Sequence, residues 1–261
     1  MSTTTQATAQ KKKGWFAQMM ASTLGRKVLM ALTGLFLCLY LVVHLAGNLQ
    51  LLVSDKGEAF NWYADFMGTN PIIQTISILN FTFIFLHIIY GITLTLMNRK
   101  ARPTQYAYSK PNANSNWRAR NMMVLGSIIL IFLIVHLVYF WGKMKLTHYG
   151  FVEEGVWVQK YSTGNSKDHQ LNLYHLVYAA FKDLWMVILY VASMIALAFH
   201  LSHGFQSAFQ TFGLNHVKYS PFIKKLGQVY SILIPLGYAL IPIIIYIQHL
   251  RNPGLLEQLL K

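Results

Sequence analysis

The sequence predicts an all-α integral membrane bundle of five transmembrane helices, and three observations support this fold class. Hydrophobic residues make up 54% of the chain and charged residues only 11%, a balance that is unusual for a soluble domain. The apolar residues fall in five long blocks, and runs of about 18 or more indicate membrane spans. The basic residues also collect in alternate loops, as the positive-inside rule describes for membrane proteins.

The five blocks set the expected helix boundaries and domains. We expect helices at about Lys27–Val53, Pro71–Met97, Asn121–Trp141, Leu173–Phe209 and Leu226–Gln248. The fourth block is longer than a bilayer requires, which predicts a tilted helix or one that extends beyond the lipid. Pro235 and Pro242 should kink the last helix. Residues 1–23 form a polar tail and interfacial segment (1–13 being the tail), 24–250 the membrane domain and 251–261 a C-terminal tail.

The charges give the predicted topology. The net charge is +14, which alone would also suit a nucleic-acid-binding protein. With five spans, the N-terminal segment and the two even-numbered loops hold 14 of the 22 basic residues and none of the eight acidic ones. This separation favours a membrane protein without nucleic acid as a partner. It predicts a cytoplasmic N-terminus and an external C-terminus.

Each of the first four predicted helices carries one histidine well inside its apolar block. These are His44, His87, His136 and His200. A polar ring inside a membrane is costly without a partner, and neutral imidazole is a common iron ligand. Four such rings predict two bis-histidine haems between the helices. The sequence contains no CxxCH motif, so the haems would be held without thioether links. Hydrogen-bonded core histidines are the alternative interpretation.

The topology predicts how these histidines pair. Helices one and three run outward, and His44 and His136 both lie toward their outer ends. Helices two and four run inward, and His87 and His200 both lie toward their inner ends. We therefore expect an outer pair, His44 with His136, and an inner pair, His87 with His200, on the order of 10–15 Å apart. His203 is the rival fourth ligand, or a contact of a haem propionate.

Two glycines near the histidines have two possible interpretations. Gly91 and Gly204 each follow a histidine by four residues and so share its helix face. They would let a porphyrin approach the backbone, or let helices pack closely. Candidate propionate partners at the inner level are Arg26, Lys27, Ser202 and His203. The single cysteine, Cys38, excludes an intramolecular disulfide and multi-cysteine metal sites.

Local patterns across about residues 24–247 resemble a known family. They are VVHLAGN, GEAFNWYADFM, LHIIYG, IVHLVYF and FHLSHGFQSAFQTFGL, in this order. The chain is similar in them to the five-helix di-haem cytochrome b membrane anchors (b558 family) of succinate dehydrogenase and fumarate reductase. The resemblance implies that His44, His87, His136 and His200 are the axial ligands. It also implies first-with-third and second-with-fourth pairing, which agrees with the depth argument.

The resemblance further implies a function in a succinate:quinone oxidoreductase of the bacterial cytoplasmic membrane. A flavoprotein and an iron–sulfur subunit would dock on the cytoplasmic face. Electrons would pass between the iron–sulfur subunit and a quinone through the two haems, and members of this family commonly use menaquinone. The chain alone would not oxidise succinate, because it has no Gly-rich dinucleotide fingerprint. The direction of catalysis stays open.

Quinone reduction also takes protons, so the quinone site needs a proton-transfer group. Glu58, on the outer side before the second helix, is the candidate, with an ordinary exposed carboxylate as the alternative. Asn48, Gln50 and Asn61 are candidate hydrogen-bond partners of a quinone carbonyl.

Three other classes of protein compete with this interpretation. The haem subunit of another quinone-linked dehydrogenase differs mainly in its soluble partners. A histidine-relay transporter would carry acidic residues or broken helices at the midplane, whereas all the acidic residues here lie outside the inner half. A membrane di-iron enzyme would need clustered histidine boxes, and only His200 and His203 lie close together in a helix.

Overall fold

The computed structural model of the protein describes residues 14–101, 115–148, 157–159 and 169–259. Five helices in it are long and apolar enough to cross a membrane, so the predicted number of spans is confirmed and the chain is a multi-pass membrane protein. They are α2 (Thr23–Leu49), α4 (Pro71–Lys100), α7 (Met122–His136), α10 (Leu184–Thr211) and α11 (Ser220–Arg251). After His136 the third span continues through a π-helical segment, η2 (Leu137–Gly142), into α8 (Lys143–His148).

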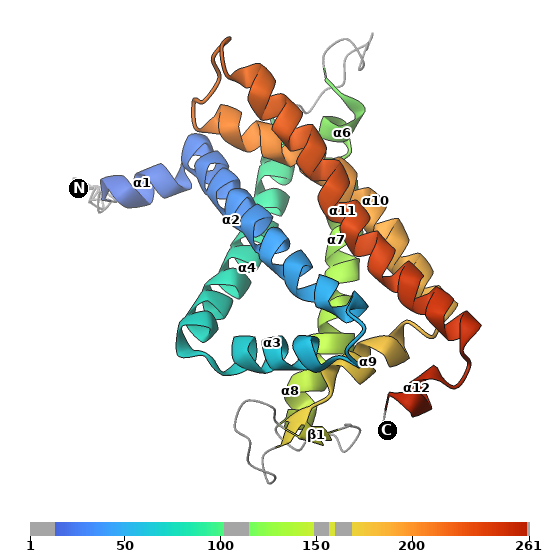
Figure 1. The fold of residues 1–261 in the computed structure, drawn as a ribbon. Helices are drawn as coiled ribbons and strands as arrows, with labels where there is room; N and C mark the ends of the chain where they lie inside the picture. The colour runs from blue at the N-terminus through green and yellow to red at the C-terminus, as the bar shows by residue number, and fades with distance from the viewer. Residues whose placement is uncertain (1–13, 102–114, 149–156, 160–168, 260–261) are drawn as a thin grey trace, which may run out of the picture.

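The remaining elements are short and lie at the two ends of the bundle (Figure 1). The helical ones are α1 (Trp15–Ala21), η1 (Gln50–Leu52), α3 (Glu58–Thr69), α6 (Trp117–Arg120), α9 (Leu173–Ala180) and α12 (Leu255–Gln258). An antiparallel ribbon pairs β1 (Trp157–Gln159) with β2 (His169–Leu171). The predicted polar tail, residues 1–13, lies outside the described residues.

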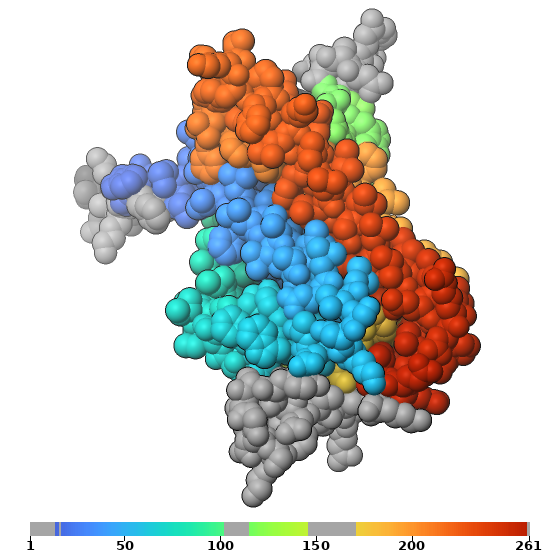
Figure 2. Space-filling model, in the orientation of Figure 1, coloured from blue at the N-terminus to red at the C-terminus, as the bar shows by residue number. Residues whose placement is uncertain are grey.

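The first four spans form the corners of a square in cross-section. Helix α2 packs beside α4 and α10, α7 packs beside α10, and α4 and α7 close the square with a looser contact. Helices α2 and α7 therefore face each other along one diagonal, and α4 and α10 along the other. Helix α11 packs outside the square against α10 and α2 (Figures 1 and 2).

Side-chain caps explain where several helices begin. The Ser22 hydroxyl accepts a hydrogen bond from the Gly25 amide at the start of α2. Asn70 accepts from the Ile72 and Ile73 amides at the start of α4, and Pro71 follows it in the first helical position. These contacts use amides that a helix leaves without an internal partner. The predicted start of the second span at Pro71 is confirmed.

The structure corrects the expectation for the fourth block, which is not one long helix. Helix α9 ends at Ala180, and α10 begins at Leu184. Phe181 turns inward and is buried, whereas Lys182 and Asp183 are exposed. Two adjacent charges cannot continue inside an apolar span without a large cost, so the chain breaks there. Helix α9 consequently lies at the same end of the bundle as α3. We call this the outer end and the opposite one the inner end, after the topology predicted from the charges.

Helix α11 runs without interruption through Pro235 and Pro242, both of which are buried. Two tyrosines on this helix connect it to α2. The Tyr230 and Tyr238 hydroxyls donate to the carbonyl oxygens of Cys38 and Leu41, at 2.6 and 2.7 Å. These bonds fix α11 along α2 on the outside of the square.

The side-chain core is unevenly distributed over the five spans. Helices α10 and α11 supply most of the buried residues, including Met186 and Ile245. By contrast, α4 and α7 supply one buried residue each, Asn80 and Leu125. Apolar packing therefore holds α10, α11 and α2 together. Helices α4 and α7 contribute little to this core, and each carries one of the histidines described below.

Candidate functional site

The four histidines lie as two facing pairs. The ring centres of His44 and His136 are 5.9 Å apart, with an angle of 86° between the ring planes. The ring centres of His87 and His200 are 6.2 Å apart, with an angle of 63°. The structure thus brings together the histidines that the depth argument paired. We call His44 and His136 the outer pair, and His87 and His200 the inner pair.

Each pair spans one diagonal of the helix square. The outer pair joins α2 to α7, and the inner pair joins α4 to α10. A Cβ added at Gly34 of α2 would lie 3.3 Å from His87 Cε1, so Gly34 marks the level of the inner pair on α2. His44 follows Gly34 by ten residues, which is about 15 Å of helix rise. The two pairs therefore cross the bundle at different depths.

The ring separations match those of two imidazoles on opposite sides of one metal ion. A metal–nitrogen bond is about 2 Å long, and the ring centre lies about 1 Å further back. Two rings that bind one ion from opposite sides therefore have centres about 6 Å apart. Both observed separations, 5.9 and 6.2 Å, agree with this value. The donor set, two neutral imidazoles, is one that haem iron accepts.

Two of the four imidazoles have a hydrogen-bond partner at Nδ1. His87 Nδ1 lies 3.2 Å from the hydroxyl oxygen of Thr33, and His136 Nδ1 lies 3.0 Å from that of Tyr190. A bond at Nδ1 leaves Nε2 as the nitrogen that is available to a metal.

Two buried polar atoms have no hydrogen-bond partner within the described part of the chain. They are His200 Nδ1, in the inner pair, and the side-chain oxygen of Asn80. Asn80 precedes His87 by seven residues on α4, which is about 10 Å toward the outer level. Buried polar atoms in proteins nearly always have partners, so both atoms indicate that a further polar group belongs in the bundle.

Aromatic side chains enclose the outer pair. Tyr40 stacks on His44 with ring centres 5.3 Å apart, and the Tyr238 ring centre lies 5.9 Å from the same imidazole. His136 has Phe132 and Phe140 at 5.7 and 5.5 Å. Phe140 belongs to the π-helical turn η2, and such turns are frequent at functional sites.

Glycines, rather than aromatic rings, flank the inner pair. Gly34 of α2 faces His87, and a Cβ at Gly126 of α7 would lie 3.9 Å from His200 Cε1. Of the glycines proposed from sequence, Gly91 lies against the Met30 methyl group, and a Cβ at Gly204 would meet no atom within 4 Å. Sequence reasoning missed Gly34 and Gly126. Their signal was a shared spacing, since each precedes the histidine of its own helix by ten residues.

Basic and hydroxyl groups lie at the inner end of the square, one turn beyond His200. Arg118 of α6 donates to the Ser202 hydroxyl at 2.9 Å and interacts electrostatically with the half-buried His203. Among the residues predicted for this level, Arg26 is half-buried and donates to the Met97 sulfur, and Lys27 is exposed. Sequence reasoning missed Arg118, because nothing in its loop indicates that α6 folds back onto α10.

At the outer end, α3 places Glu58 as its first residue, with an exposed side chain. The neighbouring Asp55 carboxylate accepts from the Gly57 and Ala59 amides, both at 2.9 Å, and so caps this helix. Gly57 has a φ of 87°, and a Cβ there would lie 2.2 Å from the Tyr174 ring. Glycine is therefore required at this turn for both its conformation and its size.

The structure gives Asn61 a structural role instead of leaving its amide free for a quinone. Asn61 is 4% exposed, and its nitrogen donates to Asn172 at 3.0 Å. Its oxygen accepts from the Tyr174 amide at 3.0 Å. Asn172 also caps α9 through the His175 amide. This network fixes α9 to α3 across the outer end, where burial raises the pKa of the Tyr174 hydroxyl above its usual range.

The other predicted quinone contacts lie near the outer end of α2. The Asn48 amide nitrogen donates to the His44 carbonyl oxygen at 2.8 Å, and Gln50 begins η1. Tyr63 of α3 lies against Gly47, where a Cβ would be 2.5 Å from its ring. Gly47 is one helical turn beyond His44, so Tyr63 brings α3 close to the outer pair. Partial burial raises the pKa of the Tyr63 hydroxyl.

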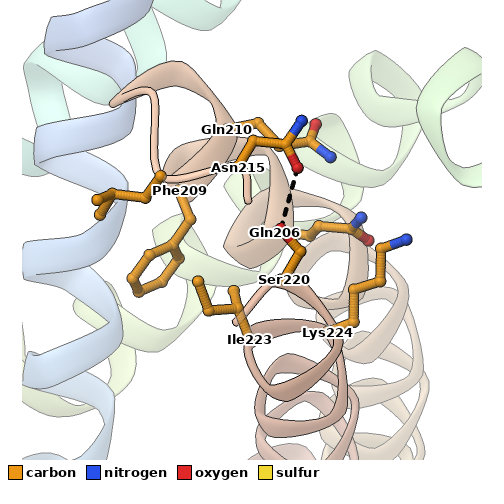
Figure 3. A pocket seen from close by; sticks show the side chains of 8 residues that line it. Gln206, Phe209, Gln210, Asn215, Ser220, Ile223 and Lys224 are labelled. Atoms are coloured by element: carbon orange, nitrogen blue, oxygen red, sulfur yellow. Dashed lines mark hydrogen bonds between the residues drawn. The ribbon is translucent and has the colours of Figure 1, made fainter. Parts of the chain in front are cut away.

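A surface hollow lies between α10 and α11 at the inner end (Figure 3). Its lining includes Gln206, Asn215, Ser220 and Lys224. Its volume is about 10 Å³, which is the space of roughly one water molecule. This hollow is far too small for a quinone or a haem and lies apart from both histidine pairs.

No family model, curated protein or solved structure matches the chain. The resemblance to the di-haem membrane anchors therefore rests on the local sequence patterns, and the chemistry of the site rests on its own geometry.

Proposed function

We propose that the chain is the membrane subunit of a succinate:quinone oxidoreductase and binds two haem b groups. The observation that carries this proposal is the arrangement of four membrane histidines as two facing pairs, at two depths and on the two diagonals of the bundle. One haem belongs to the outer pair and one to the inner pair. Two redox groups at different depths suit electron transfer between a partner on one face and a quinone nearer the other.

The chain's own residues hold, orient and enclose the two groups. His44 and His136 would hold the iron of the outer haem, and His87 and His200 that of the inner haem. Bound haem supplies one-electron oxidation and reduction. Arg118 and Ser202 would neutralise and hydrogen-bond the propionate groups of the inner haem. The aromatic rings around the outer pair would exclude water from the outer haem.

The quinone is expected near the outer pair, with menaquinone as the type that the family resemblance suggests. Glu58 is the proposed proton-transfer group, since its carboxyl is exposed at the outer end, within reach of water. Asn48 and Gln50 remain candidates for contacts to a quinone carbonyl. Asn61 is no longer proposed, because its amide is used between α3 and α9.

The partners are a flavoprotein and an iron–sulfur subunit on the inner face. The sequence segments predicted for this face contain basic residues and no acidic ones. Those that the structure describes include Arg99, Lys218, Lys224 and Lys225. They would face the cytoplasm of a bacterium under the positive-inside rule, with the C-terminus outside. The same charges attract anionic lipid headgroups, which are the other expected contact.

A haem count tests the proposal directly. The protein is purified from membranes, and dithionite-reduced minus oxidised spectra are recorded with a pyridine haemochrome assay. We expect two b-type haems per chain. Direct edge-to-face packing of imidazoles gives similar ring separations, and a well-folded preparation without haem would favour that explanation. Reduction of the haems by succinate in the complex with its soluble subunits would then identify the dehydrogenase.

A further inference from the structure

Two hydroxyl side chains each contact the Nδ1 atom of one paired histidine. Thr33 of α2 contacts His87, and Tyr190 of α10 contacts His136. Both are buried, with 1% of Thr33 and 8% of Tyr190 exposed. In each case the hydroxyl comes from a helix of the other diagonal, so it approaches the ring from the side and not along the line between the two paired rings.

The surroundings of Thr33 decide the direction of its hydrogen bond. The Thr33 hydroxyl lies 2.9 Å from the Leu29 carbonyl oxygen and 3.1 Å from that of Met30. The hydroxyl donates its single proton to these carbonyl oxygens, which leaves only its oxygen lone pairs for the His87 ring. The hydroxyl oxygen can then only accept from His87, which requires a proton on Nδ1. The lone pair of this imidazole is consequently on Nε2.

Tyr190 is held in place for the same role at the outer pair. Its ring packs edge-on against Phe132 and Phe181, with ring centres 4.8 and 4.9 Å apart. This packing leaves its hydroxyl 3.0 Å from His136 Nδ1. A histidine that binds a metal through Nε2 keeps its proton on Nδ1 and donates it, and the phenolic oxygen is available as the acceptor.

Building on the proposed function, we propose that Thr33 and Tyr190 are positioning residues, one for each haem. Each hydroxyl oxygen accepts a hydrogen bond from the Nδ1–H of one paired histidine and fixes that ring so that Nε2 is the atom that would bind iron. Such a bond makes the imidazole a stronger electron donor. It therefore favours the ferric state and lowers the reduction potential of that haem alone.

The test is a redox titration of the purified complex, followed optically so that the two haems are resolved. In Thr33→Val, which keeps the shape but removes the acceptor, we expect the potential of the inner haem to rise and that of the outer haem to stay. In Tyr190→Phe we expect the potential of the outer haem to rise and that of the inner haem to stay. Weaker haem retention, by ~10–100-fold in affinity, is expected at the same haem. Thr33→Ser, which retains a hydroxyl, should restore the wild-type potential.

Matched variants remove hydroxyls that contact no histidine in the described part of the chain. The buried Ser193 donates to the Leu189 carbonyl and the half-buried Tyr230 to that of Cys38, so Ser193→Ala and Tyr230→Phe should leave both potentials unchanged. If Thr33→Val does not fold, Thr33→Ala replaces it.

Unchanged potentials in Thr33→Val and Tyr190→Phe, or equal shifts of both haems in each variant, would overturn this inference while leaving the proposed function intact. A wild-type protein without haem would instead overturn the proposed function.

Discussion

The outer and inner histidine pairs have similar ring separations but very different surroundings. The outer pair lies among aromatic rings, including Tyr40 and Phe140, next to the larger of the two clusters of buried hydrophobic side chains in the described residues. The inner pair lies beside the bare backbone of Gly34 and Gly126. The comparison teaches that aromatic side chains enclose one pair, whereas the other lies against glycine positions of the neighbouring helices.

This difference matters for how each pair accommodates a large planar group. Around the outer pair, aromatic side chains that can rotate would surround such a group and shape the site. Around the inner pair, glycines would provide the space, and rotation of a long side chain placed there could not restore it. The two sites should therefore respond to different substitutions.

The largest expected effect is the loss of one haem when one histidine of a pair is replaced. His200→Ala should reduce the haem count from two to one and leave the outer haem spectrum unchanged. His136→Ala should also reduce the haem count to one, but should leave the inner haem spectrum unchanged. Pyridine haemochrome counts and low-temperature spectra measure both. His216→Ala, in the exposed loop between α10 and α11, is the control. Retention of both haems in either variant would break the assignment of pairs.

Glu58→Gln should impair the quinone reaction at the outer end without affecting the haems. Because general acid–base groups commonly contribute ~100-fold or more to rate, quinone-linked turnover should fall by about that factor. Haem content and reduction of a soluble artificial acceptor should not change. Asp65→Asn, in the same helix α3, serves as the comparison. Full quinone-linked turnover in Glu58→Gln would contradict its proposed role.

Gly126→Leu tests the inner site alone. A Cβ at Gly126 would meet His200 at the ordinary contact distance of 3.9 Å, so Gly126→Ala should be tolerated. The longer leucine side chain should lower inner haem affinity by roughly ten-fold, a cost of about 1.4 kcal/mol, with no change at the outer haem. Haem loss during titration with apomyoglobin measures this. Equal behaviour of the alanine and leucine variants would show that the glycine provides no cofactor space.

The smallest expected effect concerns the network that holds α3 and α9 over the outer end. Asn61→Leu leaves the buried Asn172 amide and the Tyr174 amide without partners, which should cost about 1–3 kcal/mol of stability. Thermal unfolding monitored by circular dichroism reports this loss. The outer haem spectrum should broaden while the inner one stays sharp. A change confined to the inner haem would be incompatible with the position of this network.

Hydropathy and depth were sufficient to predict five spans and the pairing of the rings. Both follow from rules that apply to every membrane helix, namely its length and its direction. The length of the fourth apolar block does not predict the break between α9 and α10, although the two adjacent charges of Lys182 and Asp183 indicate it. Gly34, Gly126 and Arg118 depend on which helix faces which, and this arrangement is not encoded in the periodicity of any single helix. Asn61 was misjudged for the same reason, since its partner Asn172 is distant in sequence.

The crossing of the two pairs on different diagonals has a consequence for biosynthesis. Helices α2 and α4 emerge from the ribosome first, yet each carries only one half of a different pair. The outer pair becomes complete when α7 enters the membrane, and the inner pair only when α10 follows. Cofactor capture would thus proceed from the outer to the inner site during insertion, and a nascent chain that stops after its second span would have no complete site for either group.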